Sequence, residues 1–135
     1  MSAIRIRRAI IDAMLDYARQ TPQSECCGLL AGSSGLIQFA FPQENVASDP
    51  ATRYKIDPKE IVRFVREMRA SGLEFLGIYH SHPKGENAPS ARDIEQAYYS
   101  EEAYFIISPQ PDASKPVRAF SIRDGRVTEL EIQIV

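Results

Sequence analysis

The sequence predicts an α+β (mixed α/β) fold, with one mixed, largely antiparallel β-sheet flanked by three helices. Two segments show the apolar spacing of amphipathic helices, a third helix is expected to start at Ser90, and short strand-like segments separate them along the chain. The chain of 135 residues has no internal repeat, low-complexity segment or linker. We therefore expect a single domain over residues 1–135 with a hydrophobic core of its own.

The first third of the chain predicts a strand, a helix and a strand pair. Residues 4–7 alternate apolar and charged, which is typical of a short edge strand. Residues 8–20 carry an apolar stripe of helical spacing. Residues 25–31 and 36–41 are strand-like and mostly apolar, and the Gly-Ser-Ser-Gly turn of residues 32–35 joins them.

A long connection and a second helix follow. Residues 42–57 contain two prolines and little periodicity, apart from a short strand-like segment at 53–56. A connection of this length inside a compact domain is more often functional than accidental. Asp57-Pro58-Lys59-Glu60 is a strong helix start, and Gly72 is suited to end that helix.

The second half of the chain predicts a strand, a third helix and three further strands. The apolar segment 73–79 leads into the only two histidines of the sequence. We expect a helix from Ser90 to about Ser100 and a strand at 103–108. Residues 117–123 and 126–135 then form a hairpin across an Asp-Gly dipeptide, a favoured tight turn.

Composition limits the classes of function. A net charge of −2 and a pI near 5.7 give no general attraction to nucleic acid or to anionic membranes. No segment approaches the roughly 20 apolar residues of a membrane span, and the first residues have no signal-peptide core. Cys26 and Cys27 are adjacent and would point to opposite faces of a strand, so we expect reduced thiols and a cytoplasmic protein.

The two histidines suggest a metal site. His80 and His82 are two residues apart, so their side chains leave a strand on the same face. Two converging imidazoles at a strand end are a natural start for a metal site. A hydrogen-bonded histidine pair without a metal is the alternative, and a lone His-x-His motif leaves it open.

Oxygen ligands are available shortly after the histidines. Ser90-Ala91-Arg92-Asp93 is close to a capping box, which alone would account for Ser90 and Asp93. The dipole of the following helix also favours the ionised, metal-binding form of Asp93. Two histidines and one carboxylate are the ligand set of hydrolytic zinc sites that keep a position for water. The capping and ligand interpretations of Asp93 are compatible.

A hydrolytic site of this kind also needs a proton acceptor. Glu25 is the candidate, because it opens an apolar strand between Ser24 and Cys26, an unusual place for an acid without a task. An acid that faces solvent at a strand end is the alternative.

Together these residues resemble the signature of the JAMM (MPN-plus) zinc metallopeptidases. Glu25, His80-Ser81-His82-Pro83, Ser90 and Asp93 match it at the spacing of that family. The resemblance implies an MPN/JAMM (cytidine-deaminase-like) fold and one Zn²⁺ per chain, bound by His80, His82 and Asp93. It also implies Glu25 as the general acid/base and Ser90 as the residue that stabilises the oxyanion.

Two local sequences, Glu25-Cys26-Cys27-Gly28-Leu29-Leu30 and Pro42-x-x-Asn45, are similar to the small single-domain prokaryotic branch of this family. The resemblance implies cleavage of amide or isopeptide bonds after the C-terminal glycine of a ubiquitin-like or sulfur-carrier protein with a Gly-Gly end. In this branch it further points to release of cysteine from sulfur-carrier proteins.

Other functions stay open at this point. One is a catalytically silent MPN-type scaffold that only binds partners, although such relatives usually lack the ligands. Another is a cysteine peptidase that uses Cys26 or Cys27 with a histidine base, but buried strand cysteines are more often inert. A zinc nucleoside deaminase is disfavoured because the chain has no Cys-x-x-Cys ligand pair.

Overall fold

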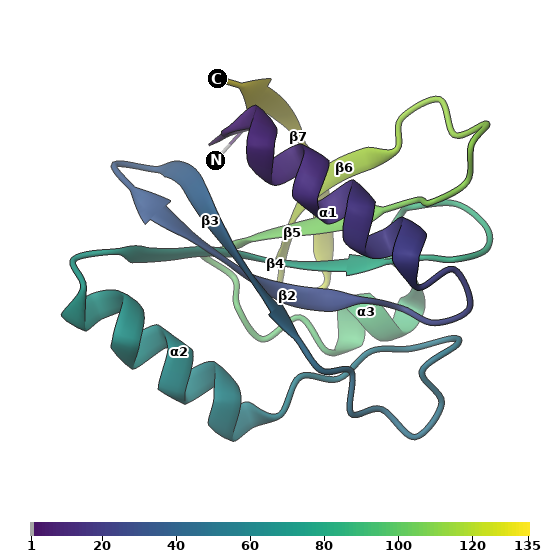
Figure 1. Ribbon diagram of the computed structural model, residues 1–135, viewed down its shortest axis with the longest axis horizontal. Helices are drawn as coiled ribbons and strands as arrows, with labels where there is room; N and C mark the ends of the chain where they lie inside the picture. The colour runs from purple at the N-terminus through teal and green to yellow at the C-terminus, as the bar shows by residue number, and fades with distance from the viewer. Residues whose placement is uncertain (1) are drawn as a thin grey trace.

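The computed structural model describes residues 2–135, which form seven strands and three helices (Figure 1). In chain order they are β1 (Ala3–Ile6), α1 (Arg8–Gln20), β2 (Cys27–Ser33), β3 (Leu36–Gln43), α2 (Pro58–Ala70), β4 (Glu74–Ser81), α3 (Ala91–Glu95), β5 (Ala103–Ile107), β6 (Val117–Arg123) and β7 (Arg126–Ile134). Across residues 2–135, every helix is too short or too polar to cross a membrane.

The strands form a closed barrel in the order β1-β3-β2-β4-β5-β6-β7. β2 pairs antiparallel with β3 and β4, and β6 with β5 and β7, whereas β1–β3, β1–β7 and β4–β5 are parallel. The predicted mixed, largely antiparallel sheet with three helices is thus confirmed. Its closure was not predicted.

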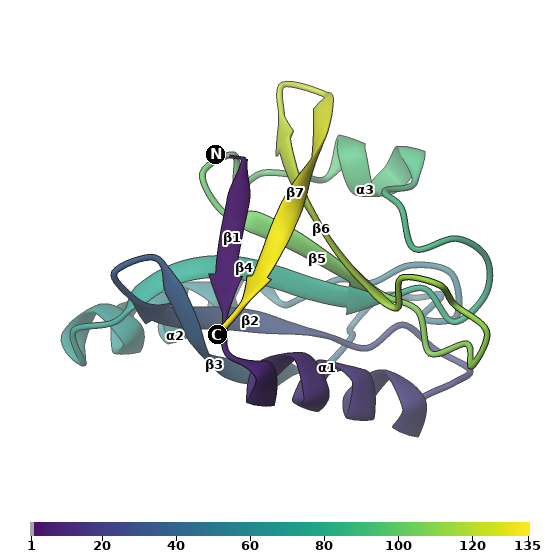
Figure 2. The same cartoon turned by 90° about the horizontal axis from the view of Figure 1, so that it is seen from above.

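β1 is the strand that closes the barrel. It pairs in parallel with β3 on one side and with β7 on the other, and Figure 2 shows it beside β7. Ile4 and Ile6 are buried in this position. The prediction of an edge strand at residues 4–7 is therefore wrong, because the pattern of a four-residue strand carries no information about its partners.

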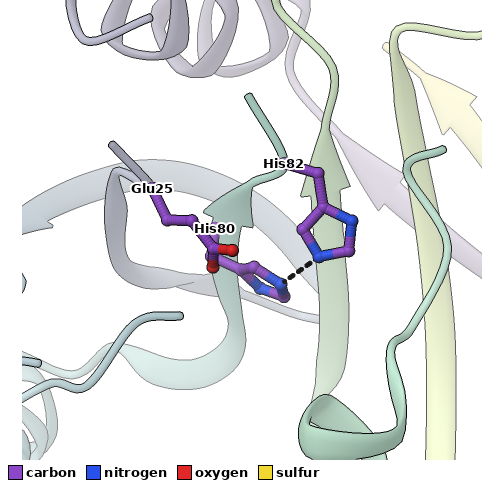
Figure 3. Close-up of side chains that lie close together, drawn as sticks. All are labelled: Glu25, His80 and His82. Atoms are coloured by element: carbon purple, nitrogen blue, oxygen red, sulfur yellow. Dashed lines mark hydrogen bonds between the residues drawn. The ribbon is translucent and has the colours of Figure 1, made fainter. Parts of the chain in front are cut away.

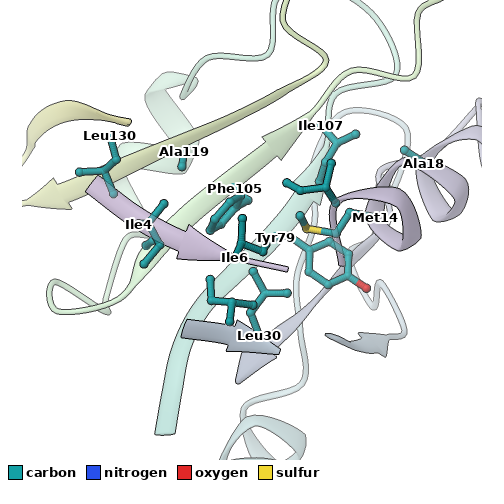
Figure 4. Packing of buried hydrophobic residues seen from close by; sticks show 13 residues of the cluster. Ile4, Ile6, Met14, Ala18, Leu30, Tyr79, Phe105, Ile107, Ala119 and Leu130 are labelled. Atoms are coloured by element: carbon teal, nitrogen blue, oxygen red, sulfur yellow. The ribbon is translucent and has the colours of Figure 1, made fainter. Parts of the chain in front are cut away.

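The strands β2, β4 and β5 carry apolar side chains on both faces. Leu30, Tyr79 and Phe105 belong to a cluster that includes Met14 and Ala18 of α1 (Figure 4). Their sequence neighbours Leu29, Ile78 and Tyr104 belong to a second cluster on the other face, which includes Met68 of α2. Strands buried on both faces have nearly continuous apolar sequences, as β2 and β5 do.

The register between β2 and β4 determines where the polar residues at their ends lie. Cys27 pairs with His80 and Gly28 with Tyr79. Gly28 is required here because a Cβ atom at this position would collide with the Tyr79 ring. Beyond the pair Cys27–His80 the same antiparallel register brings Glu25 alongside His82.

The ends of α2 follow the prediction. Asp57 caps its first turn and accepts a 3.0 Å hydrogen bond from the Lys59 N–H. Gly72 follows the last turn with a φ of 78°, which glycine adopts without strain. The N–H of Leu73 then donates to the carbonyl of Met68 at 2.8 Å, the hydrogen bond of a Schellman motif.

Several predicted elements differ from the structure in their extent, and one is absent. The third helix ends at Glu95 rather than near Ser100, because the N–H of Tyr99 donates to the Tyr104 hydroxyl and its ring packs edge-on against Phe75. Residues 53–56, expected as a short strand, form none. The strand expected from Glu25 begins at Cys27, so Glu25 lies in the segment before it.

Candidate metal centre

Three ligand-type atoms from two elements converge at the end of β4. The Nε2 atom of His82 lies 3.1 Å from His80 Nε2 and 3.1 Å from Asp93 Oδ2. His80 Nε2 lies 3.3 Å from the same Asp93 oxygen. In a tetrahedral zinc site with bonds of about 2.0–2.1 Å, neighbouring ligand atoms are about 3.3 Å apart. Both the donor types and the spacing of these three residues therefore fit a zinc ion.

The two histidines converge because His80 in β4 and His82 directly after its end are two residues apart in an extended chain, so their side chains share a face, as the sequence predicts. Figure 3 shows both rings on one side of the strand end, with Glu25 beside them. Ser81 lies between them in sequence and faces the other way, where its Oγ accepts a 2.9 Å hydrogen bond from the Cys26 N–H. Ser81 thereby ties the strand that carries the histidines to the segment that carries Glu25.

Asp93 reaches the histidines from the first turn of α3. Its Oδ2 also accepts a 2.9 Å hydrogen bond from the Ser90 N–H, and Ser90 Oγ accepts a 3.1 Å hydrogen bond from the Asp93 N–H. These two bonds form a capping box. The capping interpretation is thus confirmed, and the same carboxylate contacts His80 and His82, as a ligand role would require.

Different contacts hold the two histidine rings in place. His82 Nδ1 lies 2.9 Å from the carbonyl oxygen of Glu86 and donates to it, which leaves Nε2 free for a metal. The His80 ring is almost fully buried and stacks on Tyr54, with ring centroids 4.2 Å apart. Tyr54 belongs to the long connection between β3 and α2, so this connection also shapes the site.

Glu25 is the second carboxylate of the site. It is only 6% exposed, which excludes the interpretation of a solvent-facing acid. Its Oε1 is buried and has no hydrogen-bond partner among residues 2–135. The ligand atoms of Glu25, His80 and His82 all lie within 4.8 Å of one another. Asp93, by contrast, is in direct contact with both Nε2 atoms, so it is the better placed of the two carboxylates to share a metal with them.

The two carboxylates are pushed toward opposite protonation states. Burial raises the pKa of Glu25 from 4.5 to about 7, with a smaller upward effect from Asp93 and an opposing effect of His82. Burial also disfavours ionised Asp93, but hydrogen bonds from His80 and His82 outweigh it and hold the Asp93 pKa well below its ordinary range. Such a divergence separates a permanently charged ligand from a group that exchanges protons near neutral pH.

The histidine pKa values also differ. Burial lowers the pKa of His80 and so favours the neutral ring that binds metals. Burial would do the same for His82, but its hydrogen bonds to Asp93 and to the Glu86 carbonyl raise its pKa overall. The raised pKa favours the charged ring of His82, whereas metal binding requires its neutral ring.

Asn45 is a supporting residue whose role sequence reasoning missed. Its side-chain amide donates to the carbonyl oxygens of Glu25 and Arg53, at 2.9 and 3.0 Å. Its side-chain oxygen accepts from the N–H groups of Ala47 and Lys55, at 3.0 and 3.1 Å. Its presence in the Pro42-x-x-Asn45 motif was the available signal, but the contacts themselves depend on how the connection folds.

The cysteines do not fit a nucleophile. Both are free thiols, and Cys27 is buried in β2. Burial raises the pKa of Cys26, and it raises that of Cys27 to about 12. Both thiols are therefore held in the protonated, unreactive form, which disfavours a cysteine peptidase.

Comparison with known proteins identifies the family of the chain. A family model of prokaryotic homologues of the JAB domain matches residues 7–123. The chain is 38% identical over 104 residues to a desampylase of Haloferax volcanii, covering 73% of this chain and 75% of that protein. It is 32% identical over 132 residues to the CysO-cysteine peptidase of Mycobacterium tuberculosis, covering 96% and 90%. A probable TtuB-protein conjugate cleaving protease of Thermus thermophilus is 35% identical over 127 residues, covering 94% and 81%.

Solved structures show the same fold. A solution structure of a protein from Desulfitobacterium hafniense matches with a TM-score of 0.84 and 33% identity, covering 98% of this chain and 92% of that one. A structure described as JAMM, a metalloprotease-like zinc site in the proteasome and signalosome, matches with a TM-score of 0.62 and 19% identity, covering 97% and 98%. At that lower identity the likeness concerns the fold alone.

Proposed function

Because the chain belongs to the family of prokaryotic homologues of the JAB domain, we propose that it is a zinc metallopeptidase that cleaves conjugates of a small protein modifier. The scissile bond is the amide after the C-terminal glycine of a ubiquitin-like or sulfur-carrier protein. The observation that carries the proposal is the convergence of His80, His82 and Asp93 to within 3.1–3.3 Å beside a buried glutamate. Family membership agrees with the resemblance seen in the sequence.

In this proposal His80, His82 and Asp93 hold one zinc ion per chain. Zinc, when bound, supplies a Lewis acid that polarises the scissile carbonyl and makes a water molecule nucleophilic near neutral pH. The chain prepares the three ligands for it. The Glu86 carbonyl orients the His82 ring, the stack with Tyr54 orients the His80 ring, and the capping box orients Asp93.

Glu25 is the general base and then the general acid. Its carboxylate accepts a proton from the attacking water and returns that proton to the departing amine, so the group ends in its starting state. A pKa near 7 suits both transfers. Among the described residues Oε1 has no hydrogen-bond partner, so this oxygen is available to meet the water.

Ser90 stabilises the negative charge that develops on the carbonyl oxygen. Its Oγ uses a lone pair to accept the Asp93 N–H, which leaves the hydroxyl hydrogen free to donate elsewhere. A neutral donor at this place favours the transition state over the substrate. Ser90 thus serves as both the helix cap and the oxyanion donor.

The substrate tail binds in an extended conformation along the connection between β3 and α2, as an added strand. Terminal glycines suit this arrangement, because a residue without Cβ brings its carbonyl closest to the ligands. The names of the relatives, a desampylase, a CysO-cysteine peptidase and a TtuB-protein conjugate cleaving protease, support a protein conjugate as the substrate. The two free cysteines fit a reducing, cytoplasmic setting.

The test is an intact-mass assay of carrier–cysteine and carrier–lysine adducts, with and without a chelator. We expect loss of the adduct mass, inhibition by the chelator and restoration by added zinc. Replacing the terminal glycine of the carrier by alanine should inhibit strongly. Equal cleavage of the glycine and alanine tails would contradict recognition of the tail, and cleavage that ignores the chelator would contradict the metallopeptidase.

A further inference from the structure

A cavity of about 560 Å³ lies next to the metal centre, between the connection that precedes α2 and the segment that follows α3. A cavity of this size can hold several side chains of a bound peptide. Its wall combines three cationic side chains, those of Arg53, Lys55 and Arg92, with the aromatic rings of Tyr98 and Tyr99.

The cavity is a concentration of positive charge on a chain whose net charge is −2. None of its lining residues is acidic. Within residues 2–135, neither Arg53, Lys55 nor Arg92 forms a salt bridge, whereas three other arginines each pair with a glutamate. The Nε atom of Arg53 is also buried, with no hydrogen-bond partner in the part of the chain that the structure describes. Buried N–H groups in proteins normally have a hydrogen-bond acceptor, so a bound molecule is the expected source of an acceptor for this group.

The cavity also presents apolar surface. Ile56 and Ile78 lie in its wall, and Tyr98 at its rim is 79% exposed. Tyrosine and arginine are the residue types that contribute most often to binding energy at protein interfaces. An occupant that fits this surface therefore carries both an anionic group and an apolar one.

The cavity adjoins the candidate metal centre. Tyr54 lines it and stacks on His80, with centroids 4.2 Å apart, and Arg92 directly precedes Asp93 in α3. An extended peptide advances about 3.3 Å per residue. A tail whose last glycine lies at the histidines would therefore place the residues before its glycines in this cavity. A leaving cysteine or lysine side chain would fill only a small part of it.

We propose that this cavity binds the part of the substrate tail that precedes the terminal glycines, and that it selects tails carrying an acidic side chain beside an apolar one. The inference rests on the proposed function, since it concerns the substrate of the same site. Arg53 and Arg92 bind the carboxylate of the tail, and Tyr98 covers the apolar neighbour.

The test measures binding of fluorescent peptides that end in Gly-Gly and differ only in one glutamate or glutamine before the glycines. These peptides contain no scissile bond, so the result does not depend on activity. We expect the glutamate peptide to bind about tenfold more tightly, with a preference that shrinks at high salt. The variant Arg53→Gln should lose part of this preference, and the double variant Arg53→Gln/Arg92→Gln nearly all of it.

The matched control is Arg66→Gln, which removes the same charge from an exposed position on α2 outside the cavity and should keep the preference. Equal affinity of the two peptides for the unmodified protein would overturn the inference. So would a preference that survives in the double variant. Adduct cleavage tests the proposed function separately. Cleavage without acid preference removes only this inference, and an arginine-dependent preference without cleavage removes only the proposed function.

Discussion

The carbonyl oxygen of Glu25 accepts a 2.9 Å hydrogen bond from the side-chain amide of Asn45, which lies 20 residues further along the chain. The N–H of Glu25 donates to the carbonyl of Pro50 at 2.8 Å, so both backbone groups of Glu25 are bound by the same connection. That connection also carries Tyr54, which stacks on His80. Asn45 therefore links Glu25, the proposed general base, to the connection whose Tyr54 stacks on the proposed ligand His80.

Replacing Asn45 by aspartate tests this positioning role. Aspartate keeps an acceptor for Ala47 and Lys55 but cannot donate to the carbonyl of Glu25. We expect kcat to fall by about 10- to 100-fold, the scale of a small displacement of a catalytic group, with zinc content and KM little changed. Thr52→Ala in the same connection removes only an exposed hydrogen bond to Asp49 and is the control. An Asn45→Asp variant with unchanged kcat would refute the role.

The variant Glu25→Gln distinguishes a role of Glu25 as general base from a role as metal ligand. The variant should keep the fold and the zinc but lose peptidase activity by a factor of about 10² or more, because glutamine cannot accept the proton of the attacking water. Single-turnover assays on a carrier adduct measure the loss, and elemental analysis measures the metal. If the variant remains active, Glu25 is not the base and the proposed mechanism fails.

The same variant should stabilise the metal-free protein at high pH. The pKa of Glu25 is about 7 in the folded state and 4.5 as its ordinary value, so folding favours the protonated form. This favourable contribution is complete below pH 4.5 and is lost as the pH rises through 7. Metal-free Glu25→Gln should therefore exceed metal-free wild type in unfolding free energy by about 1–3 kcal/mol at pH 8.

Urea unfolding in the presence of a chelator, at pH 4.5 and pH 8, measures this difference. It should nearly vanish at the lower pH, because both forms of residue 25 are then uncharged in the folded state. The histidines and Asp93 titrate in both proteins, so their contributions largely cancel in the comparison. A difference that is the same at both pH values would show that burial of Glu25 does not control its ionisation.

The histidine–aspartate cluster could be predicted from local sequence alone. Alternation at the end of β4 brings His80 and the following His82 to one face, and the first turn of α3 brings a carboxylate after a short loop. The position of Glu25 could not be predicted in this way, since it depends on the pairing of Cys27 with His80 across 53 residues.

Local sequence patterns could not predict three other features either, because tertiary contacts determine them. The stack of Tyr54 on His80 depends on the course of a connection without periodicity. The end of α3 at Glu95 depends on the contact between Tyr99 and Tyr104. The closure of the barrel depends on the two partners of β1, and nothing in residues 3–6 specifies them.

Ser90→Ala tests the double role of the cap. The variant should lose about 1 kcal/mol of stability as a lost N-cap and keep its zinc. Its turnover should fall by roughly 10²-fold, as for loss of one oxyanion donor. Ser90→Asp keeps an acceptor for the Asp93 N–H but offers no neutral donor. An Asp variant with normal turnover would show that capping is the only task of Ser90.

Zinc content per chain distinguishes the proposed ligands, His80, His82 and Asp93, from Glu25, which stands beside them as the proposed base. Elemental analysis should find about one zinc in the wild type and in Glu25→Gln. It should find little in Asp93→Asn and none in the double variant His80→Ala/His82→Ala, because the sequence contains no other histidine. Full zinc in the double variant, or loss of zinc in Glu25→Gln with retention in Asp93→Asn, would contradict the account.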